Sequence, residues 1–482
     1  MATARWSSGL GFILATVGAA VGLGNIWRFS AVVGQNGGGA YLVPYLIAAF
    51  VCAVPMLILE LAIGRRLRTD VVSAFRSIKI EYTALGWLIL GGVLLILSYY
   101  LVLTGWVLGF FVSWFAGSQT TFGPFTASWL PVGYFIVATT VTGGVVSMGV
   151  RGGIERIAKV VMPIVFLLLI ALALYAVTLS EWEQAAAFLF TPRFSLLTDL
   201  GIWSAAFGQV FFSMSVGQGI MLTYGSYVDE ETDLFKSSLV ITIADIGAAV
   251  IAGLVIFPIV FSFGLQPTLG TELAFTTLPT AFEAMPFGRV IAVTFFGLLF
   301  FAALSSSVAL LEVGVAAAET TTRLSRHRAT LVLTSGVFAA GVPSALSYTP
   351  VNLAVAGRPI LDLVDESVGT FALPISALCI VFVFIWIADL ETIHEELGRL
   401  YPLVRYLIPF VLIVVTAAQI LGIARPAWRL VVDGVIDETA IATVTATQVL
   451  VTLLVVLAIV GYFGRESLAH GDIPGVAYLR GE

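Results

Sequence analysis

Only 11% of the 482 residues are charged and 59% are hydrophobic, whereas soluble globular proteins carry about 25% charged residues. This composition excludes a soluble globular protein and indicates an integral membrane protein, with a formal net charge of −6. Hydropathy predicts twelve membrane-spanning helices, each close to the ~20 apolar residues that cross a bilayer. We therefore expect an all-α membrane protein in which residues 1–482 form a single transmembrane domain. The expected spans are 10–32, 39–64, 84–113, 130–149, 156–178, 197–227, 236–263, 287–320, 329–344, 370–388, 405–424 and 441–463.

Basic residues gather in the loops after spans two, four and eight, which places these loops in the cytoplasm. They are Arg65, Arg66, Arg68, Arg76, Lys79, Arg151, Arg156, Lys159, Arg323, Arg326 and Arg328. Both termini are then expected to be cytoplasmic, in a multi-pass protein of the plasma membrane. Lysine scarcity fits a halophilic source organism and equally a GC-rich genome.

The first span is interrupted at mid-membrane depth by Gly18, Gly22, Gly24, Asn25 and Arg28. Glycine costs about 1 kcal/mol relative to alanine inside a helix, and arginine at the bilayer centre costs at least ~2.5 kcal/mol. Broken backbone at this depth is tolerated only where it is buried in protein or lines a cavity. Its free carbonyl groups suit a cation and the half-helix N-terminus suits an anion, so the break predicts a site for sodium and a carboxylate.

Span six carries a second interruption, between Phe211 and Gly219. Interrupted segments at corresponding positions of two halves indicate a transporter site between inverted repeats. Spans one and six each begin a group of five, which predicts a 5+5 inverted repeat with broken helices 1 and 6. Repeat one is expected at about 1–180, repeat two at about 190–400 and helices 11–12 at about 401–465.

These features resemble the neurotransmitter:sodium symporter family, and specifically its LeuT-like prokaryotic sodium-dependent amino-acid transporters. The similar segments follow in order along nearly the whole chain. They include VGLGNIWRF at 21–29, QNGGGAYLVPY at 35–45, ELAIGR at 60–65, GIERIAK at 153–159, YGSY at 224–227 and DLVD at 362–365. The resemblance implies the LeuT fold and alternating access, with spans 1, 2, 6 and 7 rocking against spans 3, 4, 8 and 9.

The resemblance also assigns a substrate site between the two breaks. Its residues would be Ala19, Ala20, Gly22, Gly24, Ile96, Tyr100, Phe212, Ser213, Ser215, Gln218, Ser306 and Leu310. Amine transporters of the family carry Asp where this chain has Gly22, so the resemblance favours a substrate that brings its own carboxylate. Gln218 replaces the Phe of the leucine-binding relative, which leaves open a polar or roomier substrate side chain.

Two sodium sites are implied by the same alignment. The first would use Ala20, Asn25, Ser213 and Asp245, and the second would use Gly18, Val21, Ala302, Ser305 and Ser306. The alternative for the two serines is hydrogen bonding to their own helix. Asp245 replaces the family's Asn, and an intramembrane carboxylate is a functional site by default. Since a fixed negative charge would repel chloride, we expect chloride-independent transport.

The family's gates are ion pairs. Arg28 and Asp365 match the extracellular pair. On the cytoplasmic side the family's Asp aligns with Thr320, so we expect a shifted pair between Arg5 and Glu319. Glu60 matches a family glutamate that braces the break in span six by hydrogen bonds.

The sequence therefore predicts a sodium-coupled amino-acid symporter that is not an enzyme, because no nucleophile–histidine pair or histidine ligand pair lies in the spans. The alternatives are a chloride-coupled amine transporter of the same fold and a non-transporting amino-acid receptor. Expected partners are the amino acid and membrane lipid, with no nucleic acid. The sequence leaves open which amino acid is carried and the oligomeric state.

Overall fold

A computed structural model describes residues 4–118, 120–265, 273–322, 324–355, 357–388 and 390–417. Within these ranges the chain is helical apart from connecting loops and one small antiparallel hairpin, β1 (Ala354–Val355) and β2 (Arg358–Pro359). The α-helices are α1 (Gly9–Ala20), α2 (Phe29–Gln35), α3 (Gly39–Ile47), α4 (Val54–Leu67), α5 (Val71–Ile78), α6 (Thr83–Ala116), α7 (Phe122–Thr126), α8 (Leu130–Ser147), α9 (Arg156–Ala176), α10 (Trp182–Phe190), α11 (Leu200–Ser213), α12 (Ile220–Gly225), α13 (Leu234–Ser262), α14 (Leu278–Ala284), α15 (Gly288–Thr322), α16 (Arg326–Leu346), α17 (Ile360–Val364), α18 (Leu373–Val381) and α19 (Glu391–Leu397).

Single-turn π-helical and 3₁₀ segments join several of these helices into longer rods. The π-helical segments are Gly24–Arg28, Ala48–Ala53, Val150–Glu155, Leu273–Thr277, Asp365–Ala372, Phe382–Ile387 and Leu403–Leu407. The 3₁₀ segments are Ile80–Tyr82, Phe194–Thr198 and Gly398–Leu400.

The described helices match the expected spans closely. Spans two to five and seven to ten are single apolar rods, and the first span is a pair of helices, Gly9–Ala20 and Gly24–Gln35, bent by 53°. Span six comprises α11 and α12, and span eleven falls on Leu403–Ala417, which follows Glu391–Leu400 after a 95° bend. The expected twelfth span, 441–463, and the end of the eleventh lie outside the described residues. The all-α membrane fold with two broken helices is confirmed.

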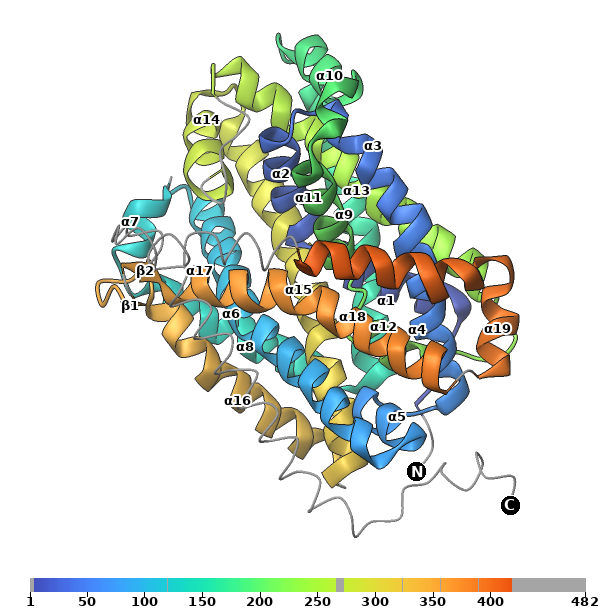
Figure 1. Cartoon of the computed structure of the whole chain (residues 1–482). Helices are drawn as coiled ribbons and strands as arrows, with labels where there is room; N and C mark the ends of the chain where they lie inside the picture. Colours follow the sequence, from blue (N-terminus) through green and yellow to red (C-terminus); the bar gives the residue numbers. More distant parts are fainter. Residues whose placement is uncertain are drawn as a thin grey trace, which may run out of the picture.

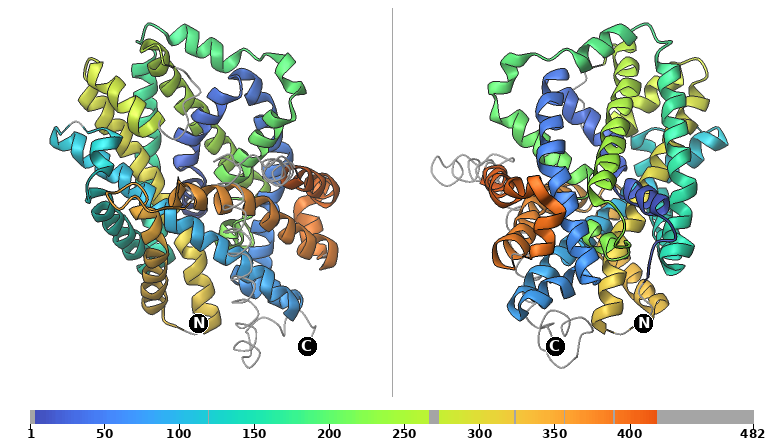
Figure 2. Two further views of the ribbon diagram at one scale, coloured as in Figure 1. Left: turned by 60° about the vertical axis from the view of Figure 1, so that its left-hand side comes forward. Right: turned by 90° about the vertical axis from the view of Figure 1, so that its right-hand side faces the viewer.

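The short helices outside the spans lie at opposite ends of the molecule. α10 and α14 lie at one end, whereas α5 and the turn between α15 and α16 lie at the other (Figure 1). Two further views keep this arrangement, with the long rods running between the two ends (Figure 2). Since Arg65, Arg326 and their neighbours belong to the second end, the positive-inside rule predicts that this end faces the cytoplasm.

Glycine allows α12 to approach α4 closely. A Cβ atom on Gly225 would lie only 2.5 Å from the carbonyl oxygen of Leu61, a distance that no real Cβ contact shows. This contact holds the second half of the broken span six against a continuous helix.

The break in span six requires a left-handed backbone. Ser215 has φ 54°, Gly217 φ 81° and Gly219 φ 70°, before α12 begins at Ile220. Such angles suit glycine but are unfavourable for serine. The Ser215 hydroxyl donates to the carbonyl oxygen of Ala19 at 3.0 Å, which helps to hold this conformation and links the two breaks.

Glu60 of α4 braces this break. Its side chain is fully buried, and its Oε1 accepts a hydrogen bond from the backbone N–H of Gly217 at 2.6 Å. The contact is the brace that the sequence predicted. A carboxylate acceptor suits this position because backbone N–H groups freed by the break have no helical partner and lie away from water.

We expect replacement of Glu60 to destabilise the break. Glu60→Leu leaves the Gly217 N–H buried without an acceptor, a loss of about 1–3 kcal/mol. Glu60→Gln keeps a carbonyl acceptor and should cost less. Thermal unfolding of the detergent-solubilised protein measures both, with the exposed Glu230→Gln as control. Unfolding of Glu60→Leu at the wild-type temperature would contradict the brace.

Candidate functional site

The twelve residues predicted to contact substrate surround a single cavity. This cavity lies where the two breaks meet and is closed laterally by α6 and α15. Its lining consists of Ala19, Ala20, Gly22, Gly24, Ile96, Tyr100, Phe212, Ser213, Ser215, Gln218, Ser306 and Leu310. Residues separated by nearly 300 positions are thus brought together, because both interrupted helices run through the centre of the fold.

The first break places backbone N–H groups beside the cavity. α1 ends at Ala20, and Val21 is extended, with φ −76° and ψ 103°. The N–H of Leu23 donates to the Tyr100 hydroxyl at 3.2 Å, and the N–H of Gly22 donates to Asn25 Oδ1 at 3.0 Å. Amide groups at the start of a half-helix together with a phenolic hydroxyl form a site suited to a carboxylate.

Arg28 contacts Phe212, which lines the cavity. The guanidinium carbon of Arg28 is 4.2 Å from the centre of the Phe212 ring, in a cation–π contact. The expected partner of Arg28, Asp365, lies beside Tyr99: both its Oδ1 and the Tyr99 hydroxyl border Gly369. The outer ion pair remains a prediction.

Three of the four residues of the first predicted cation site form one hydrogen-bonded cluster. Asn25 Nδ2 donates to Asp245 Oδ1 at 2.6 Å and to Ser213 Oγ at 2.8 Å. Ser213 Oγ in turn lies 2.9 Å from both carboxylate oxygens of Asp245. Asn25 and Asp245 are fully buried. The fourth residue, Ala20, lines the adjoining cavity. Hard oxygen atoms of this kind are the ligands that alkali and alkaline-earth cations prefer.

The second predicted cation site lies where α1 packs against α15. Ser306 Oγ donates to the carbonyl oxygens of Gly18 and Ala302, each at 3.3 Å, and Ser305 Oγ donates to Ala302 at 2.8 Å. Both serines thus bond to their own helix, as the alternative reading expected, while Ser306 also reaches across to α1. The extended conformation of Val21 turns its carbonyl away from the helix axis. The hydroxyl lone pairs and these carbonyls together could hold a cation.

The structure corrects the expected cytoplasmic pair. Arg5 forms an ion pair with Asp229 at 3.3 Å, and Glu319 forms one with Arg326 at 3.2 Å. Glu319 pairs with Arg326 because α16 begins beside the end of α15, the helix that carries Glu319. Arg5 instead lies beside the loop after α12, which carries Asp229.

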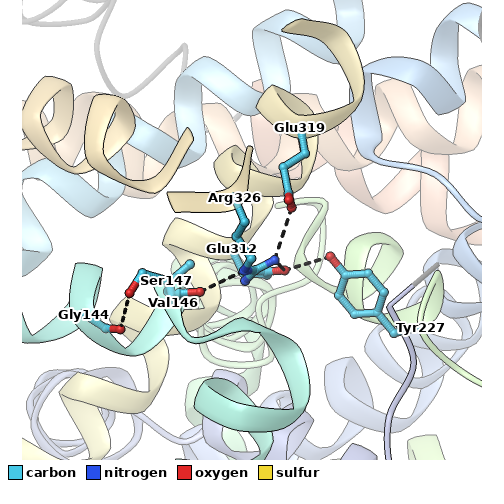
Figure 3. A network of polar contacts seen from close by, with 7 residues as sticks. All are labelled: Gly144, Val146, Ser147, Tyr227, Glu312, Glu319 and Arg326. Carbon is cyan, nitrogen blue, oxygen red and sulfur yellow. Dashed lines mark hydrogen bonds and ion pairs between the residues drawn. The ribbon is translucent and has the colours of Figure 1, made fainter. Parts of the chain in front are cut away.

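Sequence reasoning missed Arg326 and Tyr227 as partners of Glu312. The side chain of Glu312 is fully buried and bonds to both (Figure 3). A signal was present, because a buried carboxylate inside a span requires a partner. The sequence did not specify which of several nearby arginines supplies it.

Comparison with known proteins gives one consistent result. A model of the sodium:neurotransmitter symporter family matches residues 3–129 and 126–425. An uncharacterized sodium-dependent transporter of Bacillus subtilis is 35% identical over 437 residues, covering 85% of this chain and 96% of the relative. A sodium- and chloride-dependent GABA transporter 2 of Bos taurus is 27% identical, covering 64% of this chain and 60% of the relative.

A solved structure agrees with these relatives. The crystal structure of MhsT in complex with L-phenylalanine is 36% identical in sequence, with a TM-score of 0.79, and the match covers 86% of this chain and 99% of MhsT. The family model, the relatives and the shared fold with its two broken helices agree. The chain belongs to the sodium:neurotransmitter symporter family and is a sodium-dependent transporter with the LeuT fold.

Proposed function

We propose that the protein imports an α-amino acid together with sodium by alternating access. The observation that carries this proposal is the close packing around Gly22. A Cβ atom there would lie 2.6 Å from Ser306 Oγ and 2.7 Å from the Tyr100 hydroxyl, closer than real Cβ atoms come to other groups. A side chain at this position would displace Ser306 and Tyr100, so a carboxylate at this end of the cavity has to come from the substrate.

The opposite side of the cavity suits an amino group. Carbonyl groups of Ala19, Phe212 and Ser213 belong to the broken segments, and the Ser215 hydroxyl already contacts Ala19. An anion-binding and a cation-binding side across one small cavity fit a zwitterion. That the related MhsT was crystallised with L-phenylalanine supports the same substrate class. Gln218 lines the cavity and would contact the substrate side chain.

Two sodium ions per substrate provide enough driving force. One charge moving through 100 mV yields about 2.3 kcal/mol, and a tenfold concentration gradient yields about 1.4 kcal/mol. Two ions with a zwitterion therefore supply roughly 7 kcal/mol, or about 10⁵-fold accumulation. Coupling requires that sodium and substrate stabilise each other. The first site meets this condition because Ser213 belongs both to it and to the cavity.

Asp245 supports chloride-independent transport. Its buried carboxylate contacts Asn25 and Ser213 directly, so it supplies the negative charge that would balance a sodium ion there. A chloride ion at the same place would be repelled.

The orientation of the protein in the membrane follows from the charges of its loops. Both termini lie in the cytoplasm, and the protein lies in the plasma membrane.

Uptake into proteoliposomes tests the proposal. We expect a labelled amino-acid mixture to accumulate with an inward sodium gradient and not with potassium. Gly22→Ala should reduce uptake at least tenfold through the clash with Ser306 and Tyr100. Gly208→Ala, where an added Cβ meets nothing within 4 Å, serves as the matched control. Sodium-dependent binding without accumulation would instead indicate the receptor.

Chloride replacement separates this function from the chloride-coupled amine transporter. Uptake should be unchanged when gluconate replaces chloride. Asp245→Asn removes the fixed charge, and we expect uptake by this variant to become chloride-dependent. Initial rates over a chloride titration measure both effects. A several-fold loss of wild-type uptake in gluconate would refute the assignment of Asp245.

A further inference from the structure

Gln218 is a polar side chain in the wall of the cavity. It is only 4% exposed, and among the described residues its side chain makes no hydrogen bond. Gln209 on the same broken span differs, because its Nε2 donates to the carbonyl oxygen of Gly24 at 2.8 Å and its Oε1 is enclosed by other atoms. Neither amide atom of Gln218 is enclosed in this way, so its amide borders the open space of the cavity. A buried amide without a partner is unfavourable, and a ligand that supplies the partner removes this cost.

The backbone on both sides of Gln218 is held from outside the cavity. Gly217 and Gly219 adopt left-handed angles, with φ 81° and 70°. The N–H of Gly217 donates to Glu60 Oε1 at 2.6 Å, and Gly219 packs so closely that a Cβ atom there would lie 3.2 Å from Val71 Cγ2. The turn that carries Gln218 is therefore supported before any ligand binds, which lowers the cost of ordering it on binding.

The cavity has two layers along the axes of α6 and α15. Tyr100 and Ser306 flank Gly22 in the first layer, which is the carboxylate end. Ile96 and Leu310 also line the cavity, and each lies four residues from its neighbour in the first layer, about 6 Å along the helix axis. Because α6 begins at the end of the molecule where α15 finishes (Figure 1), Ile96 and Leu310 share a second layer. A substrate whose carboxylate occupies the first layer extends its side chain into the second.

The second layer combines apolar surface with one unpaired amide. Span six passes from α11 to α12 toward the same end of the molecule, so Gln218 follows Ser213 in the direction of this layer (Figure 1). None of the twelve lining residues is charged, so a charged substrate side chain would be buried without an ion-pair partner. A purely apolar side chain would pack against Ile96 and Leu310 but would leave the amide of Gln218 unbonded. A neutral side chain with a hydrogen-bonding end satisfies both surfaces.

We propose that Gln218 selects a neutral amino acid whose side chain ends in a carboxamide. A carboxamide has an acceptor oxygen and N–H donors, as Gln218 does, so the two groups can form a pair of parallel hydrogen bonds. The carbon chain of glutamine is long enough to reach from the first layer to the second, and its methylene groups can pack against Ile96 and Leu310. The inference rests on the proposed amino-acid substrate and names the chemical class of that substrate.

Binding to the detergent-solubilised full-length protein tests the selection without requiring transport. The measurement is thermal stabilisation in sodium, titrated with amino acids in pairs of nearly equal shape: asparagine with leucine, and glutamine with homoleucine. We expect each amide to bind roughly 10- to 100-fold more tightly than its apolar partner, the effect of one or two hydrogen bonds to a buried amide. Aspartate and glutamate should bind more weakly than the amides because their charge finds no partner in the second layer.

A matched pair of variants assigns the preference to Gln218. Gln218→Met keeps the length of the side chain and removes both hydrogen-bonding groups, so it should abolish the preference for amides while leucine still binds. Gln184→Met makes the same change at an exposed residue of α10 and should keep the wild-type preference.

Each outcome bears on the selection or on the transport function separately. Binding of leucine and homoleucine by the wild type as tightly as the amides would overturn the selection, and so would an unchanged preference in Gln218→Met. Either result would leave amino-acid import standing. Binding of none of these amino acids would also overturn the selection, and uptake of the labelled mixture would show whether another amino acid is imported. A preference for amides without accumulation in proteoliposomes would support the selection and count against import alone.

Discussion

Non-helical backbone within a bilayer must find hydrogen-bond partners inside the protein, and the centre of this structure is organised around that constraint. Each break in a helix is matched by a side chain from another element. Glu60 accepts from Gly217, Tyr100 accepts from Leu23, and Ser215 donates to Ala19. Two of these side chains, Tyr100 and Ser215, also line the cavity, so stability and the shape of the cavity depend in part on the same residues.

Buried carboxylates also need partners inside the protein, and Asp245 and Glu312 have partners of different kinds. The described contacts of Asp245 are with the amide of Asn25 and the hydroxyl of Ser213, and under the proposed function its negative charge would balance a bound sodium ion. Glu312 is neutralised within the protein by Arg326. A carboxylate without a protein counter-ion suits a transport site, whereas a paired one suits a fixed structural element.

The outcome of the sequence predictions follows from the range of the interactions involved. The two breaks were visible because glycine, asparagine and arginine inside an apolar run have strong local effects. The cavity residues were found because the resemblance carried their positions along with the fold. The cytoplasmic pair of Arg5 and Glu319 was wrong, because several arginines and acids lie within reach at that end and their pairing depends on the turn between α15 and α16.

The sequence by itself determined that the chain spans a membrane and where its helices are interrupted. These properties follow from composition and local pattern, because polar groups exposed to the hydrocarbon of a bilayer are energetically costly. Only the tertiary structure decided the partners of Glu312, which are Arg326 and Tyr227. Charge pairing depends on distances of a few ångströms between elements far apart in the chain, and the angle at which the helices cross sets those distances.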